Sequence, residues 1–404
     1  MSLSAMRAYE ANLPFRFTFG HSLAERNSSQ NILTVLNLRL AEGEVFGLGE
    51  SAPRAYVTGE TIDGCLGRLK GYARELFASP FVGGDDLLER LVSLFFAEEL
   101  DKLPLGASFA PLELACLDAL ARHWRVPFHK MPSLLAERFS ACGSLSSLWQ
   151  APPRTHFDWG GVVPFAGKSK LSWLLNFYKF YGFKTVKIKV GADLEEDAAK
   201  LAMARAILGP DCILRIDANC AWNLEQAERA LARLRPYDFK SIEQPLPASD
   251  IEGLCRLRAR IPETIVADES LCSIADARTL IAEKACGAFN IRISKVGGIF
   301  AALRLIELAG NASLECHLGA QVGESGILAS AQRHLALCYP FANVEGAMNL
   351  FLLKRDPVLQ CQTVPFGAVS NLRADELGLG VSLKAKAMES ISRFVFEEPV
   401  STTV

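Results

Sequence analysis

The sequence predicts an α/β protein in which parallel strands alternate with helices and close into a barrel, with a second domain ahead of it. The main observation is a series of charged residues, each near the end of a short apolar run and about 25 to 28 residues from the next: Lys187 and Lys189, Asp217, Glu243, Asp268 and Lys295. Each interval has room for one strand and one helix. Parallel strands repeated in this way form a barrel whose active site lies at their carboxyl ends.

Length and pattern also indicate the second domain. The 404 residues, half of them apolar, exceed what one small domain needs. Alternating apolar residues up to about residue 50 predict an antiparallel meander, and residues 62 to about 135 are helix-like. We therefore expect an α+β domain over residues 1–140, which residues 365–404 are candidates to join, and a barrel over residues 160–360.

From residue 161 the pattern changes to strand, helix, strand. Short apolar runs of strand length alternate with helix-like segments such as 224–234 and 299–309. The predicted strands are 162–165, 184–190, 213–217, 239–243, 264–268, 289–293, 313–317 and 343–345. About eight strands in this order are what a β/α barrel needs.

Composition limits the classes of partner. The 43 basic and 45 acidic residues nearly balance, and no basic tract stands out, so nucleic acid is not an expected partner. No apolar run approaches the length of a membrane span, and the N-terminus lacks a secretory pattern. The eleven cysteines are irregularly spaced, without a CxxC pair, which indicates reduced thiols. We expect a cytoplasmic protein that acts on a small molecule away from membranes.

Strand alternation orients the first two lysines. In the segment 186–190 the apolar residues share one face, where helices would cover them, so Lys187 and Lys189 share the inner face. An isolated Lys-Ile-Lys would more often be a half-exposed strand with solvated lysines. The acids downstream favour the inner position, because buried ammonium groups need anions nearby.

Asp217, Glu243 and Asp268 end three successive predicted strands. One such acid is often only a loop cap, but three at the same end of neighbouring strands would repel one another unless a cation lay between them. Carboxylate oxygens without His or Cys indicate Mg²⁺, with Mn²⁺ as a substitute, rather than zinc. The sequence therefore predicts a magnesium site at this end of the barrel.

Lys295 is less clearly oriented. It begins Lys295-Val296-Gly297-Gly298, which is typical of a turn from strand to helix at the same mouth. The alternation before it does not settle which way the side chain points. A surface lysine in a loop is the alternative.

Taken together, these motifs resemble the enolase superfamily, and within it the muconate lactonizing enzyme subgroup of the mandelate racemase/muconate lactonizing enzyme family. The resemblance also includes Gly47-Leu48-Gly49-Glu50, which is similar to the capping-domain signature of that family. It implies an α+β capping domain on a modified (β/α)7β TIM-type barrel. It further implies that Lys189 and Lys295 are an acid/base pair, that Lys187 supports charge on a substrate carboxylate, and that a homo-oligomer is to be expected.

Further positions are candidates for supporting roles. Asn219 and Glu269 could orient metal ligands or Lys295 from a second shell, and Glu324 matches a family position near the substrate. The two loops of the predicted capping domain carry His21, Arg26, Arg54 and Tyr56. In enzymes that this chain resembles, such loops close over the barrel and select substrates; ordinary surface loops are the alternative.

Three functions remain open. The first is Mg²⁺-dependent removal of a proton α to a carboxylate, through an enediolate, leading to racemization or epimerization of an N-acyl amino acid or dipeptide. The second uses the same intermediate for cycloisomerization of a muconate-like diacid or o-succinylbenzoate-type dehydration, for which one lysine moves a proton. The third is a non-catalytic binding protein, although no ligand or base is missing.

The segment after the last predicted strand bears on the substrate. Dipeptide epimerases of the family carry Asp-x-Asp there to hold the substrate ammonium, whereas residues 343–349 of this chain have Glu345 as their one acid. A dipeptide with a free ammonium is therefore less favoured. Arg26 and Arg54 instead suggest a substrate with a second anionic group.

Overall fold

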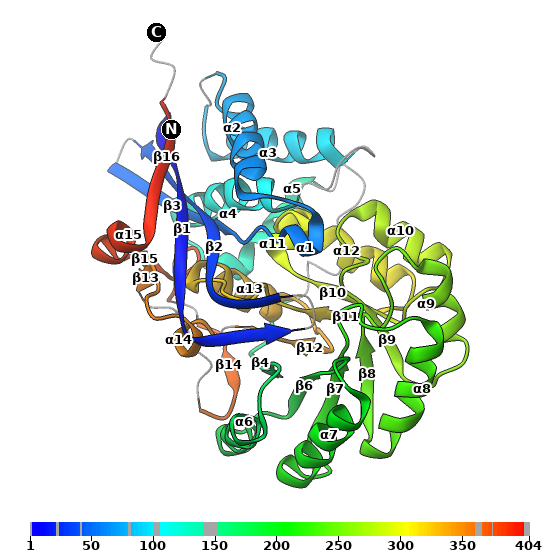
Figure 1. Ribbon diagram of the computed structural model, residues 1–404. Coiled ribbons are helices and arrows are strands. Elements are labelled where there is room, and N and C mark those ends of the chain that lie inside the picture. Colours follow the sequence, from blue (N-terminus) through cyan, green and yellow to red (C-terminus); the bar gives the residue numbers. More distant parts are fainter. Residues whose placement is uncertain are drawn as a thin grey trace.

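The computed structural model describes residues 2–21, 24–40, 43–79, 82–99, 106–139, 152–346, 348–359, 366–373 and 375–399. Within these residues an antiparallel sheet with its own helices lies beside a parallel sheet ringed by helices (Figure 1). The expected fold class, a (β/α)7β-type barrel with an α+β cap, is confirmed.

The cap is built on a four-stranded sheet in the order β16 (Ser392–Pro399), β1 (Ser2–His21), β2 (Ala24–Leu40) and β3 (Gly43–Ser51). β16 pairs antiparallel with β1, so the end of the chain returns to the sheet that its beginning forms (Figure 1). Two helices pack on this sheet, α2 (Ile62–Leu76) and α4 (Gly106–His123), and a third, α3 (Gly84–Glu99), packs on these two helices.

Helix α4 is apolar on nearly all sides and is buried along most of its length, between the cap sheet and the barrel. Its backbone comes so close to β3 that a Cβ at Gly49 would lie 1.8 Å from the Pro111 carbonyl oxygen. This contact explains a glycine in the Gly-Leu-Gly-Glu segment. α4 also reaches the barrel, because Glu113 accepts hydrogen bonds from the backbone amides of Ile299 and Phe300.

The barrel is an eight-stranded parallel sheet: β5 (Gly161–Val163), β6 (Thr185–Lys189), β7 (Ile213–Asp217), β8 (Phe239–Glu243), β9 (Thr264–Ala267), β10 (Ala288–Ile291), β11 (Glu315–Leu318) and β12 (Asn343–Val344). A parallel bridge between Gly160 and Glu345 connects the first and last strands. One expected boundary is wrong: the sixth strand was predicted to reach residue 293, but β10 ends at Ile291 and a short helix begins at Ile293.

Helices follow the strands around the barrel: α6 (Lys168–Tyr181), α7 (Leu194–Leu208), α8 (Leu224–Leu234), α9 (Ile251–Arg258), α10 (Ile274–Ala282), α11 (Ile293–Val296), α12 (Ile299–Asn311) and α13 (Gly326–Cys338). Several begin at a side-chain cap; Asn223, for example, forms a capping box with Gln226 at the start of α8. The remaining short elements are α1 (Ala55–Thr58), η1 (Phe128–Lys130), α5 (Met131–Phe139), β4 (His156–Asp158), η4 (Arg235–Tyr237), α14 (Asn349–Leu352), β13 (Val358–Leu359), β14 (Val369–Asn371), β15 (Ser382–Leu383) and α15 (Ala385–Ile391).

The two faces of the barrel strands differ in polarity. Val186, Ile188, Leu214 and Ile216 are fully buried, and as strand neighbours of the inward-facing polar residues they face the surrounding helices. The inner face carries buried polar and charged residues instead, and these residues form the candidate site.

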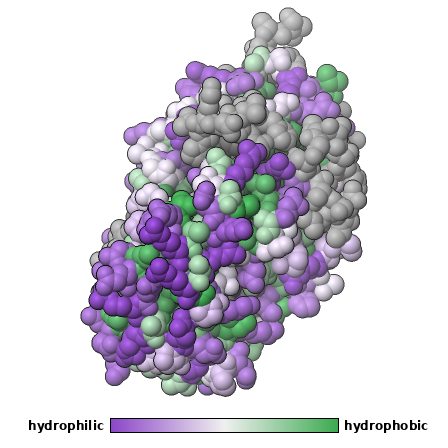
Figure 2. Space-filling model, turned by 90° about the vertical axis from the view of Figure 1, so that its right-hand side faces the viewer, coloured by the Kyte–Doolittle hydropathy of each residue, from purple (hydrophilic) through white to green (hydrophobic). Residues whose placement is uncertain are grey.

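Hydrophilic residues predominate on the outer face shown in Figure 2, with hydrophobic residues in small separate patches between them. In the part of the chain that the structure describes, no helix is long and apolar enough to cross a membrane. The cysteines of this part are free, as expected for reduced thiols.

Candidate active site

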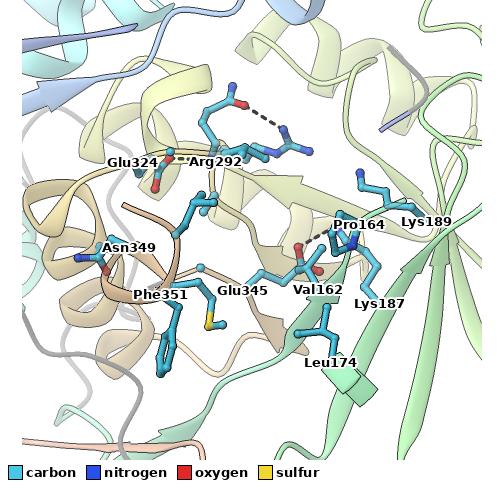
Figure 3. A pocket seen from close by; sticks show the side chains of 18 of the residues that line it. Val162, Pro164, Leu174, Lys187, Lys189, Arg292, Glu324, Glu345, Asn349 and Phe351 are labelled. Carbon is cyan, nitrogen blue, oxygen red and sulfur yellow. Dashed lines mark hydrogen bonds and ion pairs between the residues drawn. The ribbon is translucent and has the colours of Figure 1, made fainter. Parts of the chain in front are cut away.

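A cavity of about 290 Å³ opens at the carboxyl ends of the barrel strands, beneath the cap. Its outer part is apolar, with Val162, Pro164, Leu174, Met348, Phe351 and Leu352 from the barrel side and Phe17, Tyr56 and Val57 from the cap. Its inner part is polar and is lined by Lys187, Lys189, Asn219, Glu269, Arg292, Gln321, Glu324 and Glu345 (Figure 3). A carboxylate with an apolar substituent fits this division of the walls.

Both lysines of β6 reach the cavity, as the two-residue period of the strand predicts. The Lys189 amine lies 2.6 Å from Asp217 Oδ2 and 2.5 Å from Asn219 Oδ1. The Lys187 amine lies 2.9 Å from both oxygens of Glu243 and 2.7 Å from Glu345 Oε2. Burial opposes the charge of Lys187, but Glu243 and Glu345 outweigh burial and raise its pKa.

The three predicted carboxylates are fully buried and come from the ends of β7, β8 and the segment after β9. Asp217 and Glu243 are register partners on adjacent strands. Burial raises the pKa of Asp217, whereas the cations around Glu243 overcome burial and hold its pKa well below the ordinary value. The strands therefore place three acids side by side at one end of the barrel.

Side-chain cations join these three acids. Lys187 lies between two of them, 2.9 Å from Glu243 and 3.5 Å from Asp217. Arg292 lies between Glu243 and Asp268: it contacts Asp268 and lies 3.6 Å from Glu243 Oε1. Among the described residues no group of three acidic, His or Cys side chains converges at metal-binding distances.

The donor set nevertheless fits a magnesium ion. Three buried carboxylates on neighbouring strands are the all-oxygen ligands that Mg²⁺ prefers, and no described neighbour brings a thiolate or imidazole among them. The three carboxylates also need positive charge nearby, which the lysines and Arg292 supply in this structure. Asp217, Glu243 and Asp268 are therefore the residues that would hold the ion.

The side chain of Lys295, whose direction the sequence leaves open, lies outside the cavity. Lys295 lies in α11, is 1 % exposed and does not line the cavity. Its amine bonds to the Asp268 carbonyl oxygen at 2.7 Å, to Asp268 Oδ1 at 2.8 Å and to the Asn290 carbonyl oxygen at 3.0 Å. Arg292, which the motif reasoning passed over, is the cation that projects into the cavity on this side, toward the β6 lysines (Figure 3).

The glycines after Lys295 have a local reason. Gly297 and Gly298 both have positive φ, and a Cβ at Gly298 would lie 2.0 Å from a Glu113 carboxylate oxygen. The Lys-Val-Gly-Gly motif thus joins α11 to α12 at the point where Glu113 of α4 accepts hydrogen bonds from the N-terminal amides of α12.

Of the supporting residues, Asn219, Glu269 and Glu324 all line the cavity. Asn219 donates to Glu269 at 3.0 Å, and Glu269 Oε2 has no hydrogen-bond partner among the described residues. Burial, with the nearby charges of Asp268 and Asp217, raises the pKa of Glu269 to about 8. Burial also raises the pKa of Glu324 to about 8, although Glu324 accepts a hydrogen bond from the Gln321 amide.

The cap loops contribute less than expected. Tyr56 lines the cavity, and Arg26 lies over its ring, 4.9 Å from the centroid, without lining the cavity. Arg54 is 1 % exposed and does not line it either. The Arg54 guanidinium donates to backbone oxygens of the cap and to the Val322 carbonyl oxygen of the barrel, so it fastens one to the other. The side chain of His21 lies outside the described residues.

A second buried network lies below the lysines. Arg215 contacts Glu345, lies 3.1 Å from Glu243 and 2.7 Å from His317 Nδ1. Burial and the charge of Arg215 lower the pKa of His317 to about 4. Arg215 was missed, although it lies two residues before Asp217 and so shares its strand face. Glu345 is paired with Lys187 and Arg215, so each of its oxygens already has a cationic partner.

Comparisons with known proteins agree with this architecture. The sequence matches the family described as "Enolase C-terminal domain-like" over residues 174–387. A hydrophobic dipeptide epimerase of Enterococcus faecalis is 27% identical over 95% of this chain and 100% of that protein. Its crystal structure with Mg and the dipeptide L-Leu-L-Tyr has a TM-score of 0.79, at 25% identity over 95% of this chain and 100% of that chain.

A second relative has a different substrate in its name. An N-succinyl-L-Arg/Lys racemase of Bacillus cereus is 24% identical over 98% of this chain and 99% of that protein. Its crystal structure has a TM-score of 0.82 over 98% of this chain and 99% of that chain. Both relatives are named for changing the configuration of an amino-acid derivative.

Proposed function

Because the chain belongs to the enolase C-terminal domain-like family, in the mandelate racemase/muconate lactonizing enzyme group, we propose that it removes the proton α to the carboxylate of an amino-acid derivative. Members of this group with the names above are isomerases, and this chain is an enzyme of that kind. The observation that supports the proposed step is the Lys189 amine, which faces the cavity beside three buried carboxylates.

The chain's own residues would divide the work as follows. Asp217, Glu243 and Asp268 would hold Mg²⁺, which when bound supplies positive charge to the substrate carboxylate and so makes the adjacent C–H bond more acidic. Lys189 in its neutral form would take the α-proton, leaving an enediolate. Asn219 positions the Lys189 amine, and Lys187 adds a fixed positive charge beside Glu243.

The site favours a substrate without a free ammonium group. Glu345, the acid at the end of the last barrel strand, is held by Lys187 at 2.7 Å and contacts Arg215. Removing it from these cations would leave buried charges unpaired, which costs several kcal/mol. An N-acyl amino acid, whose nitrogen carries no charge, avoids that cost, and its side chain would meet the apolar outer wall.

Two outcomes of the enediolate remain. The names of the relatives support racemization or epimerization, in which the proton returns to the opposite face. One observation favours the alternative, cycloisomerization or dehydration by a single base: Arg292, rather than the amine of Lys295, lines the far wall. The step common to both outcomes is the function that we propose.

The test of this step is exchange of the α-proton in D₂O. N-Succinyl amino acids and dipeptides with apolar side chains are incubated with Mg²⁺ and the wild-type protein, and loss of the Cα–H signal is followed by NMR. We expect exchange with wild type and none above background with Lys189→Ala. Lys184→Ala, at an exposed lysine just before β6 and at the opposite end of that strand from the cavity, is the control and should exchange like wild type. Equal exchange by wild type and Lys189→Ala would refute the assignment of the base.

A further inference from the structure

The amines of the cavity lie on one side. Lys187 and Lys189 come from β6, and Lys170 lies at the rim on α6, the helix between β5 and β6. Lys170 is exposed, and its amine lies 4.8 Å from the centroid of the Phe17 ring. Among the described residues that line the cavity, none on the β10 and β11 side carries an amine.

Lys295, the lysine nearest to that side, uses all of its hydrogen-bond donors within the protein. An ammonium group has three N–H donors, and Lys295 has three oxygen partners within 3.0 Å. Two of these partners are backbone carbonyls, of Asp268 and Asn290, which fix the amine under the strand ends rather than in the cavity. To reach a substrate, Lys295 would have to break all three bonds and withdraw its ammonium donor from two buried carbonyls and a buried carboxylate.

Arg292 occupies the wall where a second amine would be needed. Its Nη1 lies 3.1 Å from Gln321 Oε1, and its Nη2 contacts Asp268. These two partners follow β11 and β9, the strands on either side of β10, and together they orient the guanidinium. A guanidinium only donates hydrogen bonds and offers no lone pair to an incoming proton.

From this arrangement we propose that the enzyme moves protons on one face of its substrate only. Lys189 removes and returns the proton, and Arg292 stands on the opposite face as a fixed cation that binds the charge of the intermediate. This inference rests on the proposed α-proton abstraction and specifies its outcome. It assigns the enzyme to single-base chemistry, although the relatives reported above are named epimerases and a racemase.

The chemistry that follows needs no second base. Lys189 takes the α-proton, and the electron pair of the C–H bond stays on the substrate. That pair can form a Cα=Cβ bond while a group on Cβ leaves with the electrons of its own bond, and the Lys189 ammonium can give that group its proton. If the leaving group belongs to a ring of the same molecule, the product is an isomer of the substrate. The substrate class is therefore a carboxylate with an oxygen or nitrogen leaving group on Cβ, and substrates without one only exchange their α-proton with retention.

The experiment compares the two enantiomers. N-Succinyl-L- and N-succinyl-D-amino acids with apolar side chains are incubated separately in D₂O with Mg²⁺, and both the Cα–H signal and the configuration of the product are followed. For wild type we expect exchange at least tenfold faster for one enantiomer, with its configuration retained. For Arg292→Lys, which places an amine on the second wall, we expect the two rates to fall within tenfold and the enantiomers to interconvert. Calorimetric titration with Mg²⁺ and thermal melting establish that the variant is folded and binds the metal.

The outcomes separate this inference from the proposed function. If wild type interconverts the enantiomers, the one-face inference is overturned while α-proton abstraction stands. If neither enantiomer exchanges, the proposed function itself fails for these substrates. A Lys295→Met variant that is folded but loses exchange of one enantiomer alone would also overturn the inference, because it would identify Lys295 as the second base.

Discussion

One wall of the cavity is formed by β6 and the wall across from it by the end of β10. Each wall has two cationic residues nearby, but these residues are placed differently on the two walls. On β6, Lys187 and Lys189 are both strand residues and both face the cavity. On the other wall the strand ends at Ile291, so Arg292 faces the cavity and Lys295, one helical turn further, lies beneath it. The comparison shows that strand phase decides which cation lines the cavity.

The two walls also differ in the atoms that they offer. The amine of Lys189 is held by two side chains, Asp217 and Asn219, which can move to release it. The amine of Lys295 is held by two backbone carbonyls as well as a carboxylate. The surroundings of Lys189 suit a group that changes its protonation state, whereas those of Lys295 suit a lysine that stabilises the fold.

The largest expected effect comes from removing the metal. After treatment with EDTA and gel filtration, α-proton exchange should fall to the uncatalysed rate, and added Mg²⁺ should restore it, because several kcal/mol of charge stabilisation are lost with the ion. NMR in D₂O measures the exchange. Persistent exchange in EDTA would mean that Lys187 and Arg292, which already lie between the carboxylates, supply the charge stabilisation that we assign to the ion.

The next effect separates the amine from its charge. Lys189→Arg keeps a cation beside Asp217 but removes the proton acceptor, so exchange should fall by about 10²–10⁴-fold, the usual contribution of a general base. Melting temperature and Mg²⁺ titration show whether fold and metal site are intact. If Lys189→Arg exchanges at more than a tenth of the wild-type rate, the β6 wall does not supply the base.

Lys295→Met tests the structural role of the other wall. Removing the ammonium leaves Asp268 with Arg292 as its remaining cationic partner and takes one donor from two buried carbonyls, so unfolding should become easier by about 1–3 kcal/mol. Urea denaturation followed by circular dichroism measures this change. Lys284→Met, at a lysine on the far side of β10, is the matched control, and a Lys295→Met protein as stable as that control would contradict the structural role.

The smallest effect is expected at the outer rim. Trp173 is 66 % exposed, lines the cavity and stacks on Phe177. Trp173→Ala should raise KM by about 2- to 10-fold with kcat little changed, because a partly exposed aromatic contact is worth about 0.5–1.5 kcal/mol. Phe180→Ala, on the same helix but outside the cavity lining, is the control. An unchanged KM would show that substrates do not reach this rim.

Much of the arrangement could be predicted because strand alternation and strand spacing are local rules. The period of two placed Lys187 and Lys189 on the inner face, and the ends of successive strands placed Asp217, Glu243 and Asp268 side by side. The same rule, applied from Asn290, would have pointed to residue 292, since Asn290 contacts Glu243 from inside the barrel. The family resemblance points to Lys295 instead, and the alternation before Lys295 leaves the orientation of its side chain open.

Other features depend on packing that no single segment reveals. Arg54 lies in a loop, yet its guanidinium is buried because oxygens from residues 30, 53 and 322 happen to meet around it. The pairing of Glu345 with Arg215 joins two strands 130 residues apart. Neither contact has a signal in the sequence, because the contacts of Arg54 form only where the cap meets the barrel, and the pairing of Glu345 with Arg215 forms only once the barrel strands have assembled.

The antiparallel partnership of β16 with β1 has a consequence for how this protein is made. During synthesis the first strand leaves the ribosome hundreds of residues before the last one, so the leading sheet must wait with an open edge while the whole catalytic portion is translated. Long delays between contacting segments slow folding. A stalled or truncated polypeptide would therefore expose this edge, and chaperone dependence should centre on the release of the final residues.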